Sequence, residues 1–458
     1  MTREDAKRFH NPRRVVSGLD RRQLIKFGTS AAAAVLVGAP AVLAQTKRFA
    51  GVTLNISCWS AAYPKFLADY IPEFTEATGI KVNYETPGLP VYNQRADLEL
   101  STKGSAYDVL NITFVFSGRW IGSGWLEPLD PYLKDPNKTP AEFDFADFLP
   151  GALDPLKDKA GQVYGVPWVT DACFSCAARM DILKAEGLGM PDTFEDLEKA
   201  ASLVHNKQGV FGFLTDNHWG WWYPPILQAY GGSIFRNPPD DLNLTLDTPE
   251  AVFAAEYLAR LVKSYGPEGA IGYNYDQVTE ALRNGRSNLT MATYATAAQV
   301  GEQTSKVNNT VGYGLLPKGP KGRFPGLATH AWGIPVAAKN KDASWEFIKW
   351  AMSKQLLLRM ANEKGVSSIL RKSVIDHPDY SKKMLINGYD TSKLFVETLK
   401  LGEQGYMKYR TVPVYPQVNV QLNQAIARIA SGQMGAKESM KQAQQILLGD
   451  FKRAGVRL

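Results

Sequence analysis

The sequence predicts an α/β protein organised as two lobes, and the prediction rests on chain length and on the pattern of apolar residues. The chain has 458 residues. Because one hydrophobic core rarely organises that many, two lobes of roughly 150–200 residues each are expected. Strand-like alternation of apolar and polar residues is followed by helical spacing. With short connections, this order predicts parallel sheets covered by helices.

The elements follow one another regularly after residue 50. Residues 52–57 alternate as a strand, and a helix with one apolar face then begins at Pro64 and ends at Gly79. Residues 80–84 and 108–112 are predicted to be two further strands. Later helices are predicted to begin at Thr193 and Thr248 and to cover residues 342–352, 419–431 and 436–448.

The first 44 residues have the composition of a signal peptide. Arg21-Arg22 precede an alanine-rich apolar stretch from Phe27 to Leu43, and small residues lead up to Ala44. This pattern predicts a twin-arginine signal peptide over residues 1–44, cleaved after Ala44, and export to the periplasm. A membrane anchor is the alternative, since the stretch is about long enough to span, but glycines and a proline interrupt it.

The signal peptide explains most of the positive charge. The chain has a net charge of +7, and residues 1–44 contain 8 Lys and Arg against 3 Asp and Glu, so the remainder is close to neutral. A nearly neutral surface argues against nucleic acid or an acidic membrane as a partner.

No motif of a known enzyme class is present. The sequence lacks a Gly-x-Ser-x-Gly elbow, a His-Glu-x-x-His motif, a phosphate-binding loop and a dinucleotide fingerprint. Four histidines beyond the signal peptide are scattered and none has metal-ligand spacing. We therefore predict no catalytic residue, no metal site and no cofactor. A glycosidase remains an alternative, because its two carboxylates can come from distant positions.

Three cysteines, Cys58, Cys173 and Cys176, suggest two interpretations. A Cys-x-x-Cys can be a redox pair or half of a zinc site. Residues 169–177, however, look like a strand, in which residues three apart point to opposite faces. Neither a second pair nor a nearby histidine is present, so buried structural thiols are favoured.

The most unusual stretch is His218-Trp-Gly-Trp-Trp-Tyr-Pro224. Its polar, glycine- and proline-bracketed surroundings favour a loop over a buried helix face. Aromatic rings can cover the apolar face of a sugar while polar groups bind its hydroxyls. We therefore expect Trp219, Trp221 or Trp222 to line a ligand cleft; the alternative is that they fill a gap between loop and core.

Several motifs, in order, resemble one family. Gly161-Gln-Val-Tyr-Gly-Val-Pro167 leads to Pro191-Asp-Thr-Phe-Glu-Asp-Leu197, and Asp108-Val109 precedes Gly124-Trp-Leu-Glu-Pro-Leu-Asp130. Together with residues 282–291, 311–317 and 345–348, they resemble the solute-binding proteins of carbohydrate ABC importers, the maltose-binding-protein-like group. The resemblance covers residues 50–450. Tyr107 in place of the usual proline and the cysteine-containing stretch 170–179 depart from the common pattern.

The resemblance implies a two-lobe periplasmic-binding-protein fold of type II, with a ligand cleft between the lobes and hinge segments. Lobe 1 would comprise residues 45–169 and 313–354, and lobe 2 residues 170–312 and 355–458. The crossings are expected near residues 168–172, 312–316 and 353–356.

The resemblance also implies ligand-binding residues. Asp171 follows the Tyr-Gly-x-Pro motif where family members often place a ligand-binding carboxylate, although a hinge ion pair is the alternative. Trp59 follows the first strand, and open α/β sheets bind ligands at strand carboxyl ends. The other candidates are Tyr294, Trp332, Tyr415 and Gln417, with Arg119 and Arg410 as further possibilities. For the aromatic residues among them, packing in the core is an equally good explanation.

The function implied is that of a periplasmic substrate-binding component of an ABC importer. It would be a monomer that binds a sugar or polyol by hinge closure and delivers it to the permease subunits in the inner membrane. A sugar phosphate, for which Arg119 could supply charge, or a polyamine is the alternative ligand. An exported polysaccharide-active enzyme is the alternative class.

Overall fold

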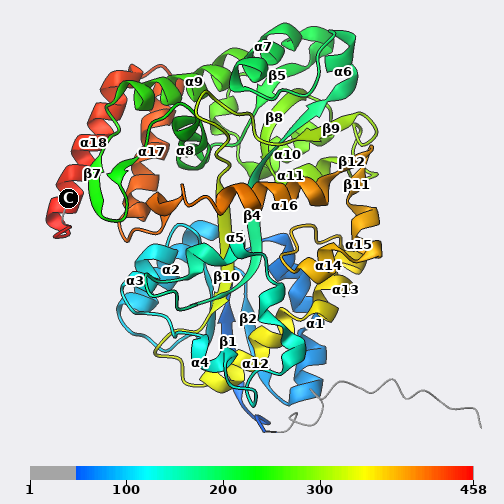
Figure 1. Ribbon diagram of the computed structural model, residues 1–458, viewed down its shortest axis with the longest axis vertical. Coiled ribbons are helices and arrows are strands. Elements are labelled where there is room, and N and C mark those ends of the chain that lie inside the picture. Colours follow the sequence, from blue (N-terminus) through cyan, green and yellow to red (C-terminus); the bar gives the residue numbers. More distant parts are fainter. Residues whose placement is uncertain (1–47, 457–458) are drawn as a thin grey trace, which may run out of the picture. The chain divides into compact units, whose positions relative to one another are not determined.

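The structure is a computed structural model that describes residues 48–456, except for the side chains of residues 173–176, 208 and 297 (Figure 1). The predicted signal peptide lies outside the described residues, and so do the thiols of Cys173 and Cys176, whose burial was predicted. The prediction of a buried thiol is confirmed for Cys58.

The first described elements form the strand–helix–strand units that the sequence predicts. They are β1 (Thr53–Ser57), α1 (Ala62–Thr78), β2 (Lys81–Glu85), α2 (Leu89–Ser101) and β3 (Val109–Ile112). Strand β1 pairs in parallel with both β2 and β3. Helix α1 buries its apolar stripe, including Leu67 and Phe74, and ends at Gly79, whose φ of 73° allows its N–H to reach the Thr75 carbonyl.

A long strand, β4 (Val166–Arg179), continues the sheet into the second half of the chain. The elements between β3 and β4 are short: α3 (Ser117–Gly122), α4 (Asp130–Leu133) and α5 (Pro150–Leu153). The sheet has the strand order β2-β1-β3-β10-β4-β8-β5, with β9 paired to β4. Strand β10 (Leu327–Gly333) runs antiparallel to both β3 and β4. Strands β4 and β10, which are antiparallel to each other, therefore lie between the parallel strands of the N-terminal part and those of the second part.

The second part follows β4. Thr193 accepts from the Asp196 backbone and forms a capping box at the start of α7, which confirms the predicted helix start. Thr248 likewise caps α9. The elements of this second part are α6 (Met180–Ala185), α7 (Phe194–Val204), β5 (Phe211–Leu214), α8 (Trp219–Ala229), β6 (Phe235–Asn237), β7 (Asp241–Leu244), α9 (Pro249–Tyr265), α10 (Tyr275–Arg283), β8 (Ser287–Thr293), α11 (Tyr294–Val300) and β9 (Val311–Gly314).

Helices dominate the remainder, as the sequence predicts. They are α12 (Lys341–Ala351), α13 (Lys354–Lys364), α14 (Lys372–Ile375), α15 (Pro378–Lys383), α16 (Thr391–Gly402), α17 (Tyr415–Ala430) and α18 (Ala436–Arg453). A small hairpin, β11 (Leu385–Ile386) and β12 (Tyr389–Asp390), precedes α16. Between residues 48 and 456, none of the helices is both long and apolar enough to cross a membrane.

Two large hydrophobic cores divide the described chain. The first core includes Leu54, Trp168, Trp345, Leu357 and Phe395. The second core includes Ala177, Phe213, Trp222, Leu258 and Ile426. Strand β4 contributes to both, and α16 lies between the two parts in Figure 1. This is a two-lobe α/β architecture.

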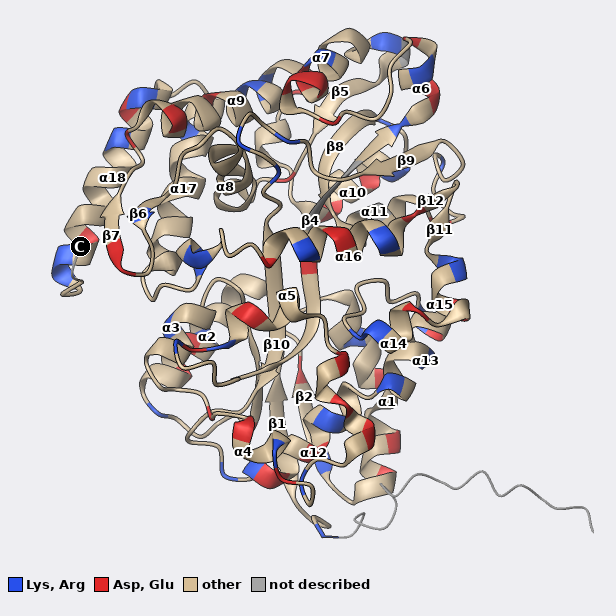
Figure 2. Cartoon of the chain, in the orientation of Figure 1, with Lys and Arg blue, Asp and Glu red and all other residues tan. Residues whose placement is uncertain are grey.

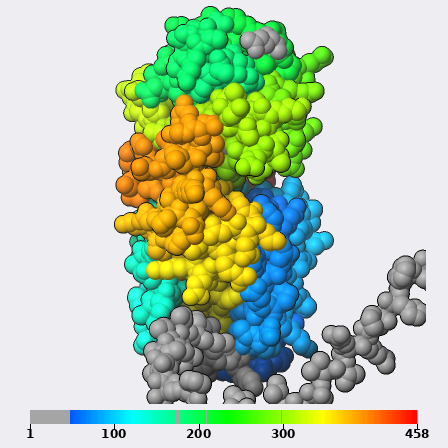
Figure 3. All heavy atoms as spheres, turned by 90° about the vertical axis from the view of Figure 1, so that its right-hand side faces the viewer, coloured from blue at the N-terminus to red at the C-terminus, as the bar shows by residue number. Residues whose placement is uncertain are grey.

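The packing corrects two expected limits between the lobes. Residues 356–399 were expected with the second lobe, but Leu356, Tyr380 and Phe395 are buried in the first core, because α13 packs against α1 and α12. Among the buried residues after Ala328, the second core resumes at Tyr409. In the side view of Figure 3, the yellow-to-orange segment with α12–α16 forms a continuous flank between the blue and green parts.

The return to the first core also comes later than expected. Tyr313 and Leu316 belong to the second core, because β9 pairs with the second half of β4. The chain re-enters the first core along β10, where Leu327 and Trp332 are buried. The residues around the expected crossing at 312–316 are therefore buried in the second core, and the first core resumes on β10.

Candidate ligand-binding site

The candidate site is built from residues that follow the carboxyl ends of strands and from the two central strands. Trp59 follows β1, Phe114 follows β3 and Asp216 follows β5. Strand carboxyl ends are where open α/β sheets place ligands. Strands β4 and β10 contribute Asp171 and His330, and Asp171 is the one acidic residue of these two strands. Figure 2 shows most other charged residues on the outer helices, with both signs interspersed.

An aromatic series connects the two cores. Its members are Trp168, His330, Phe114, Trp221 and Trp222, and successive ring centroids are 5.6, 5.7, 5.6 and 5.5 Å apart. Trp168 belongs to the first core, and Trp221 and Trp222 belong to the second. Aromatic pairs at these separations attract one another beyond their area of contact. The series therefore forms a continuous contact from one lobe to the other.

His330 lies at the first-core end of this series. Trp59 donates its Nε1–H to His330 Nδ1 at 3.1 Å, and the two ring centroids are 5.1 Å apart. Burial lowers the pKa of His330 to about 3, so the imidazole is neutral near pH 7. Trp59 itself is only half-buried. Its indole therefore presents a partly open aromatic face beside a neutral histidine.

A pair of carboxyl groups lies where β4 meets the second core. Burial raises the pKa of Asp171 to about 7, and the charge of Asp216 adds to the effect. Asp216 is buried and accepts hydrogen bonds from Trp222 Nε1 at 3.0 Å and from His218 Nδ1 at 2.7 Å. Burial alone would lower the pKa of His218, but the hydrogen bond and charge of Asp216 outweigh it and raise that pKa.

Tyr275 borders the same carboxyl groups. Burial raises the pKa of its hydroxyl to about 12, a hydrogen bond with Thr296 opposes this shift, and the charges of Asp171 and Asp216 add to it. Arg410 lies against the aromatic series, with its guanidinium carbon 5.3 Å from the Phe114 ring centroid. Carboxylates, a phenol and aromatic faces together can bind hydroxyls and cover C–H surface. Over the part of the chain that is described, no His, Cys, Asp and Glu residues cluster as metal ligands.

The structure brings four of the expected site residues together: Trp59, Asp171, Trp221 and Trp222 lie on or beside the aromatic series. The other expected residues pack elsewhere, except that Trp332 contacts Trp168. Trp332 is fully buried against Trp168 and Phe347.

The remaining expected residues are part of the cores or of α17. Tyr294 stacks on Phe395 at 4.5 Å in the first core. Trp219 and Tyr415 are buried in the second core. Gln417 is half-buried on α17. These aromatic residues therefore pack in the two hydrophobic cores, as the alternative explanation had it.

The expectation that the tryptophans lie in a loop was wrong. Residues Trp219–Ala229 form helix α8, although Pro224 and Pro225 lie within it and remove two backbone donors. Packing outweighs this loss, because α8 is buried against α9 and α17. Asn423 Oδ1 accepts from the Gly220 N–H at 2.9 Å, and a Cβ at Gly220 would lie 2.6 Å from Asn419. Glycine at this position lets the two helices approach.

Sequence reasoning missed several residues of the site. Phe114, Asp216, His218, Tyr275 and His330 were not proposed as site residues. Two of them had a recognisable signal: Asp216 lies two residues after the carboxyl end of a buried strand, and His330 is the one titratable residue in the apolar stretch 327–333. Arg119 pairs with Asp97 at 2.9 Å on the N-terminal part.

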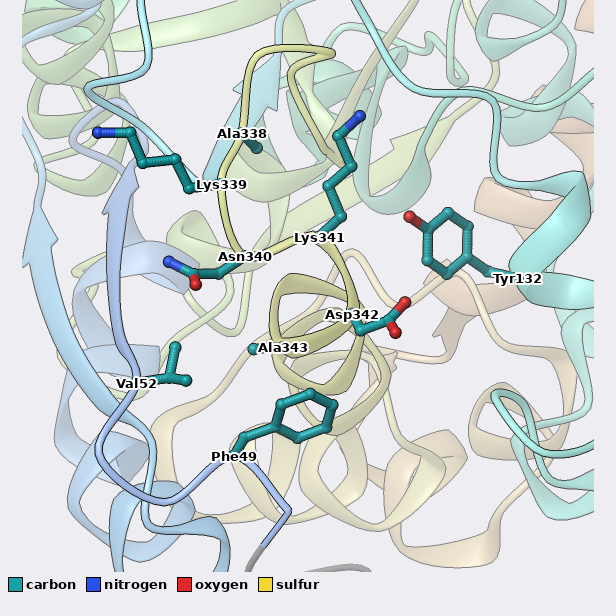
Figure 4. Close-up of a pocket in the computed structure, with 9 residues that line it drawn as sticks. All are labelled: Phe49, Val52, Tyr132, Ala338, Lys339, Asn340, Lys341, Asp342 and Ala343. Carbon is teal, nitrogen blue, oxygen red and sulfur yellow. The ribbon is translucent and has the colours of Figure 1, made fainter.

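A separate pocket of about 540 Å³ lies at the start of α12 (Figure 4). Phe49, Val52 and Tyr132 line it together with residues 338–343. Lys138 pairs with Asp342 beside it at 2.7 Å. None of its lining residues belongs to the aromatic series or to the carboxyl pair, so the two sites are distinct.

Comparison with known proteins agrees with this architecture. Among solved structures, the chain resembles an ABC transporter solute-binding protein from Agrobacterium vitis with bound D-mannitol. The TM-score is 0.77 at 24% identity, and the match covers 88% of this chain and 99% of that one. The fold is therefore that of the two-lobe solute-binding proteins.

Sequence relatives lead to the same family. A mannitol-binding protein from Pseudomonas aeruginosa is 26% identical over 80% of this chain and 85% of the relative. An erythritol/L-threitol-binding protein from Mycolicibacterium smegmatis is 24% identical over 72% of each chain. The sequence profile of the bacterial extracellular solute-binding proteins matches residues 60–356. The chain belongs to the bacterial extracellular solute-binding protein family.

Proposed function

We propose that this protein is the solute-binding component of an ABC importer and that it binds a polyol or a sugar between its two lobes. The observation that supports the ligand class most directly is the buried carboxyl of Asp171 beside Asp216 and the aromatic series. The relatives named for mannitol and for erythritol or L-threitol support the same class.

The chemistry of the site suits a polyhydroxylated ligand. A carboxylate accepts two or more hydrogen bonds from hydroxyl groups. Half-buried Trp59 can cover a C–H face, and the Tyr275 hydroxyl can donate or accept. Each hydroxyl removed from water needs a partner, which gives specificity. A dissociation constant near 1 µM corresponds to about −8 kcal/mol, which a few such contacts can supply after the costs of association.

Binding would be coupled to movement of the lobes. We assign β1–β3 and α12–α15 to the first lobe and β5, β8, α7–α9, α17 and α18 to the second, with β4, β10 and α16 as the crossings. A ligand closes the lobes only if it binds the closed state better than the open one. The closed form is then the species that a permease in the inner membrane would recognise.

The proposal also covers how the chain reaches its place of action. We propose export by the twin-arginine route, cleavage after Ala44, a periplasmic location and a monomeric state. The sequence pattern of residues 21–44 supports the route and the cleavage site. Mass spectrometry of the chain recovered from the periplasm tests the cleavage, and the expected N-terminus is Gln45.

An anionic ligand is the second candidate, because Arg410 lies against Phe114 at the site. A guanidinium beside an aromatic ring is a common anchor for phosphate or carboxylate groups. The second candidate would bring a negative charge near Asp171 and Asp216, whereas a polyol or sugar is neutral.

A thermal-shift experiment distinguishes the candidates. The exported chain is heated with D-mannitol, ribitol, erythritol, maltose, glycerol 3-phosphate or spermidine. A ligand at a thousandfold excess over its dissociation constant stabilises the folded state by about 4 kcal/mol. We expect the largest shift with a polyol or sugar. A shift with glycerol 3-phosphate or spermidine alone would overturn the ligand class, and turnover of an oligosaccharide would overturn the binding function.

A further inference from the structure

The hydrogen bond between Trp59 and His330 fixes the position of the proton on the imidazole. An indole N–H can only donate. Trp59 Nε1 lies 3.1 Å from His330 Nδ1, so Nδ1 must accept and cannot bear a proton. In a neutral imidazole the proton is then on Nε2. The geometry therefore selects one tautomer without any other information.

The surroundings keep this imidazole neutral. Rings of Trp59, Trp168 and Phe114 lie 5.1–5.7 Å from its centroid, and the side chain is 2% exposed. Asn111 Nδ2 lies 3.5 Å from the same Nδ1 atom, which is consistent with an accepting Nδ1. His330 is thus a neutral ring that presents one donor, the Nε2–H.

That donor has no hydrogen-bond partner among the side chains and backbone that the structure describes. Nε2 is not one of the fully buried polar atoms that lack a partner, so water can reach this donor until a ligand hydroxyl replaces it. A group that arrives with the ligand is the partner that such a donor awaits.

Strand register places this donor beside Asp171. His330 pairs with Val169, and Ala328 pairs with Asp171, so Asp171 and His330 are diagonal neighbours on one face of the β4–β10 pair. Thr170 and Thr329 occupy the opposite face, where their hydroxyls lie 2.9 Å apart. The register then shifts between His330 and Ala331, and a bulge of this kind re-aims a side chain next to a site.

We propose that His330 is a specificity-determining residue whose Nε2–H donates to a hydroxyl oxygen of the ligand, while Asp171 accepts from a neighbouring hydroxyl. Trp59 is the positioning residue that holds the tautomer. The proposal rests on the proposed function and deepens it. A vicinal diol satisfies both groups, because one hydroxyl accepts and the next donates. An ammonium group cannot accept from Nε2–H, so the pair selects neutral polyols over polyamines.

Three variants test the proposal, with D-mannitol, ribitol and erythritol as probes and calorimetry of the exported chain as the measurement. His330→Phe keeps a ring and removes the donor, and we expect at least tenfold weaker binding of the best probe. His330→Gln can accept from Trp59 through Oε1 and donate through Nε2, so binding should return to within about threefold of the original chain. Trp59→Phe should weaken binding and let both tautomers appear.

Trp345→Phe is the matched control for Trp59→Phe. Trp345 also donates its indole N–H, to Thr139 at 3.0 Å, but it lies in the first core away from the site. It should lose stability without losing affinity. Unfolding of each variant by urea shows whether it is folded under the conditions of the titration.

Nitrogen NMR of the histidine ring gives a reading that does not depend on any variant folding. In the original chain without ligand, we expect a protonated Nε2 and an unprotonated Nδ1, and the Nε2–H resonance should move when the probe is added. A protonated Nδ1, an Nε2–H resonance unmoved at saturating probe, or full affinity in folded His330→Phe would overturn the proposal. If no polyol or sugar binds the original chain, the proposed function itself fails, which is a different result from failure of the variants alone.

Discussion

Two buried groups of charged residues, one in the first lobe and one at the candidate site, differ in how their charges are matched. In the first, Arg371 is completely buried; its Nε donates to the Met352 carbonyl at 2.7 Å and its Nη1 faces Asp147 at 3.4 Å. Burial would raise the pKa of Asp147, but hydrogen bonds from Ser373 and the nearby cations outweigh it, so that pKa is lowered.

At the candidate site the balance is reversed. Burial raises the pKa of Asp171 to about 7, and the next largest influence on it is a second acid, Asp216. The first group favours ionisation of its acid, although burial lowers the pKa of Arg371 to about 10. The second keeps a carboxyl in an environment that opposes its ionisation. Perturbed acids of the second kind are typical of functional sites, where local stability is given up for binding.

Removing the cation from the stabilised group should have the largest effect. Arg371→Met removes the buried cation that faces Asp147 at 3.4 Å, leaving only Lys354, among the described residues, near that carboxylate, and takes the guanidinium away from the Phe148 ring, 4.1 Å distant. Breaking a buried pair in this way costs about 3–5 kcal/mol of unfolding free energy, which urea denaturation measures.

The control for Arg371→Met is Arg359→Met, at an exposed pair. Arg359 binds both oxygens of Glu73, at 2.8 and 3.1 Å, but the two side chains are 45% and 53% exposed. Its loss should cost less than about 1 kcal/mol. Equal losses in the two variants would show that Arg371 is not a buried anchor.

Removing the acid from the site should have the opposite sign. The folded-state pKa of Asp171 is raised from 3.8 to about 7, so the unfolded chain ionises first, and stability falls as pH rises from about 4 to about 7. Asp171→Asn should therefore be as stable as the original chain at pH 4 and more stable at pH 8, by roughly 2–4 kcal/mol, since each pKa unit is worth about 1.4 kcal/mol.

The same Asp171→Asn variant should bind its ligand at least about tenfold more weakly, because an amide has fewer acceptor positions than a carboxylate. Urea unfolding at pH 4 and pH 8, with calorimetry at pH 7, separates the two effects. A variant that is less stable at pH 8, or one that retains full affinity, would contradict the role assigned to Asp171.

The smallest effect is expected at His218. Its pKa is raised by Asp216, so the stabilisation is fully present below the unfolded pKa of about 6.5 and is lost as pH rises through the raised folded value. The side chain is 50% exposed, and solvent screening limits the gain to less than about 1 kcal/mol. His218→Gln should lower the melting temperature at pH 5.5 more than at pH 9, and a larger loss at pH 9 would reverse the sign.

Local patterns predicted the local parts of this fold. The alternation in residues 52–57, the stripe of α1 and the cap at Thr193 depend on residues close in sequence, and the structure confirms all three. The choice of core for residues 356–399 depends on packing against α1, nearly 300 positions earlier, and α13 has no local feature that reveals it. The same limit hid helix α8, whose burial between other helices overrides its two prolines.

The site divides in the same way. A motif predicted Asp171 and strand order predicted Trp59, whose ring lies 5.1 Å from that of His330 in the aromatic series. The sequence marks His330 as unusual in an apolar strand, but its hydrogen-bond partners lie more than 200 positions away and only the structure reveals them. Trp332 and Tyr415 were expected at the site together with Trp59, but the sequence does not distinguish a fully buried aromatic ring from a half-buried one.

Strands β4 and β10 each contribute residues to both hydrophobic cores, and we propose that they cross between the lobes; they also contribute Asp171 and His330. Two of the proposed recognition groups therefore belong to neither lobe. A chimaera that exchanged a whole lobe with a relative would keep or replace these residues according to where the strands were cut, and it would inherit specificity only in part. Any twist of the two strands would change the spacing between acceptor and donor, so the reach of the binding groups and the angle between the lobes cannot be tuned separately.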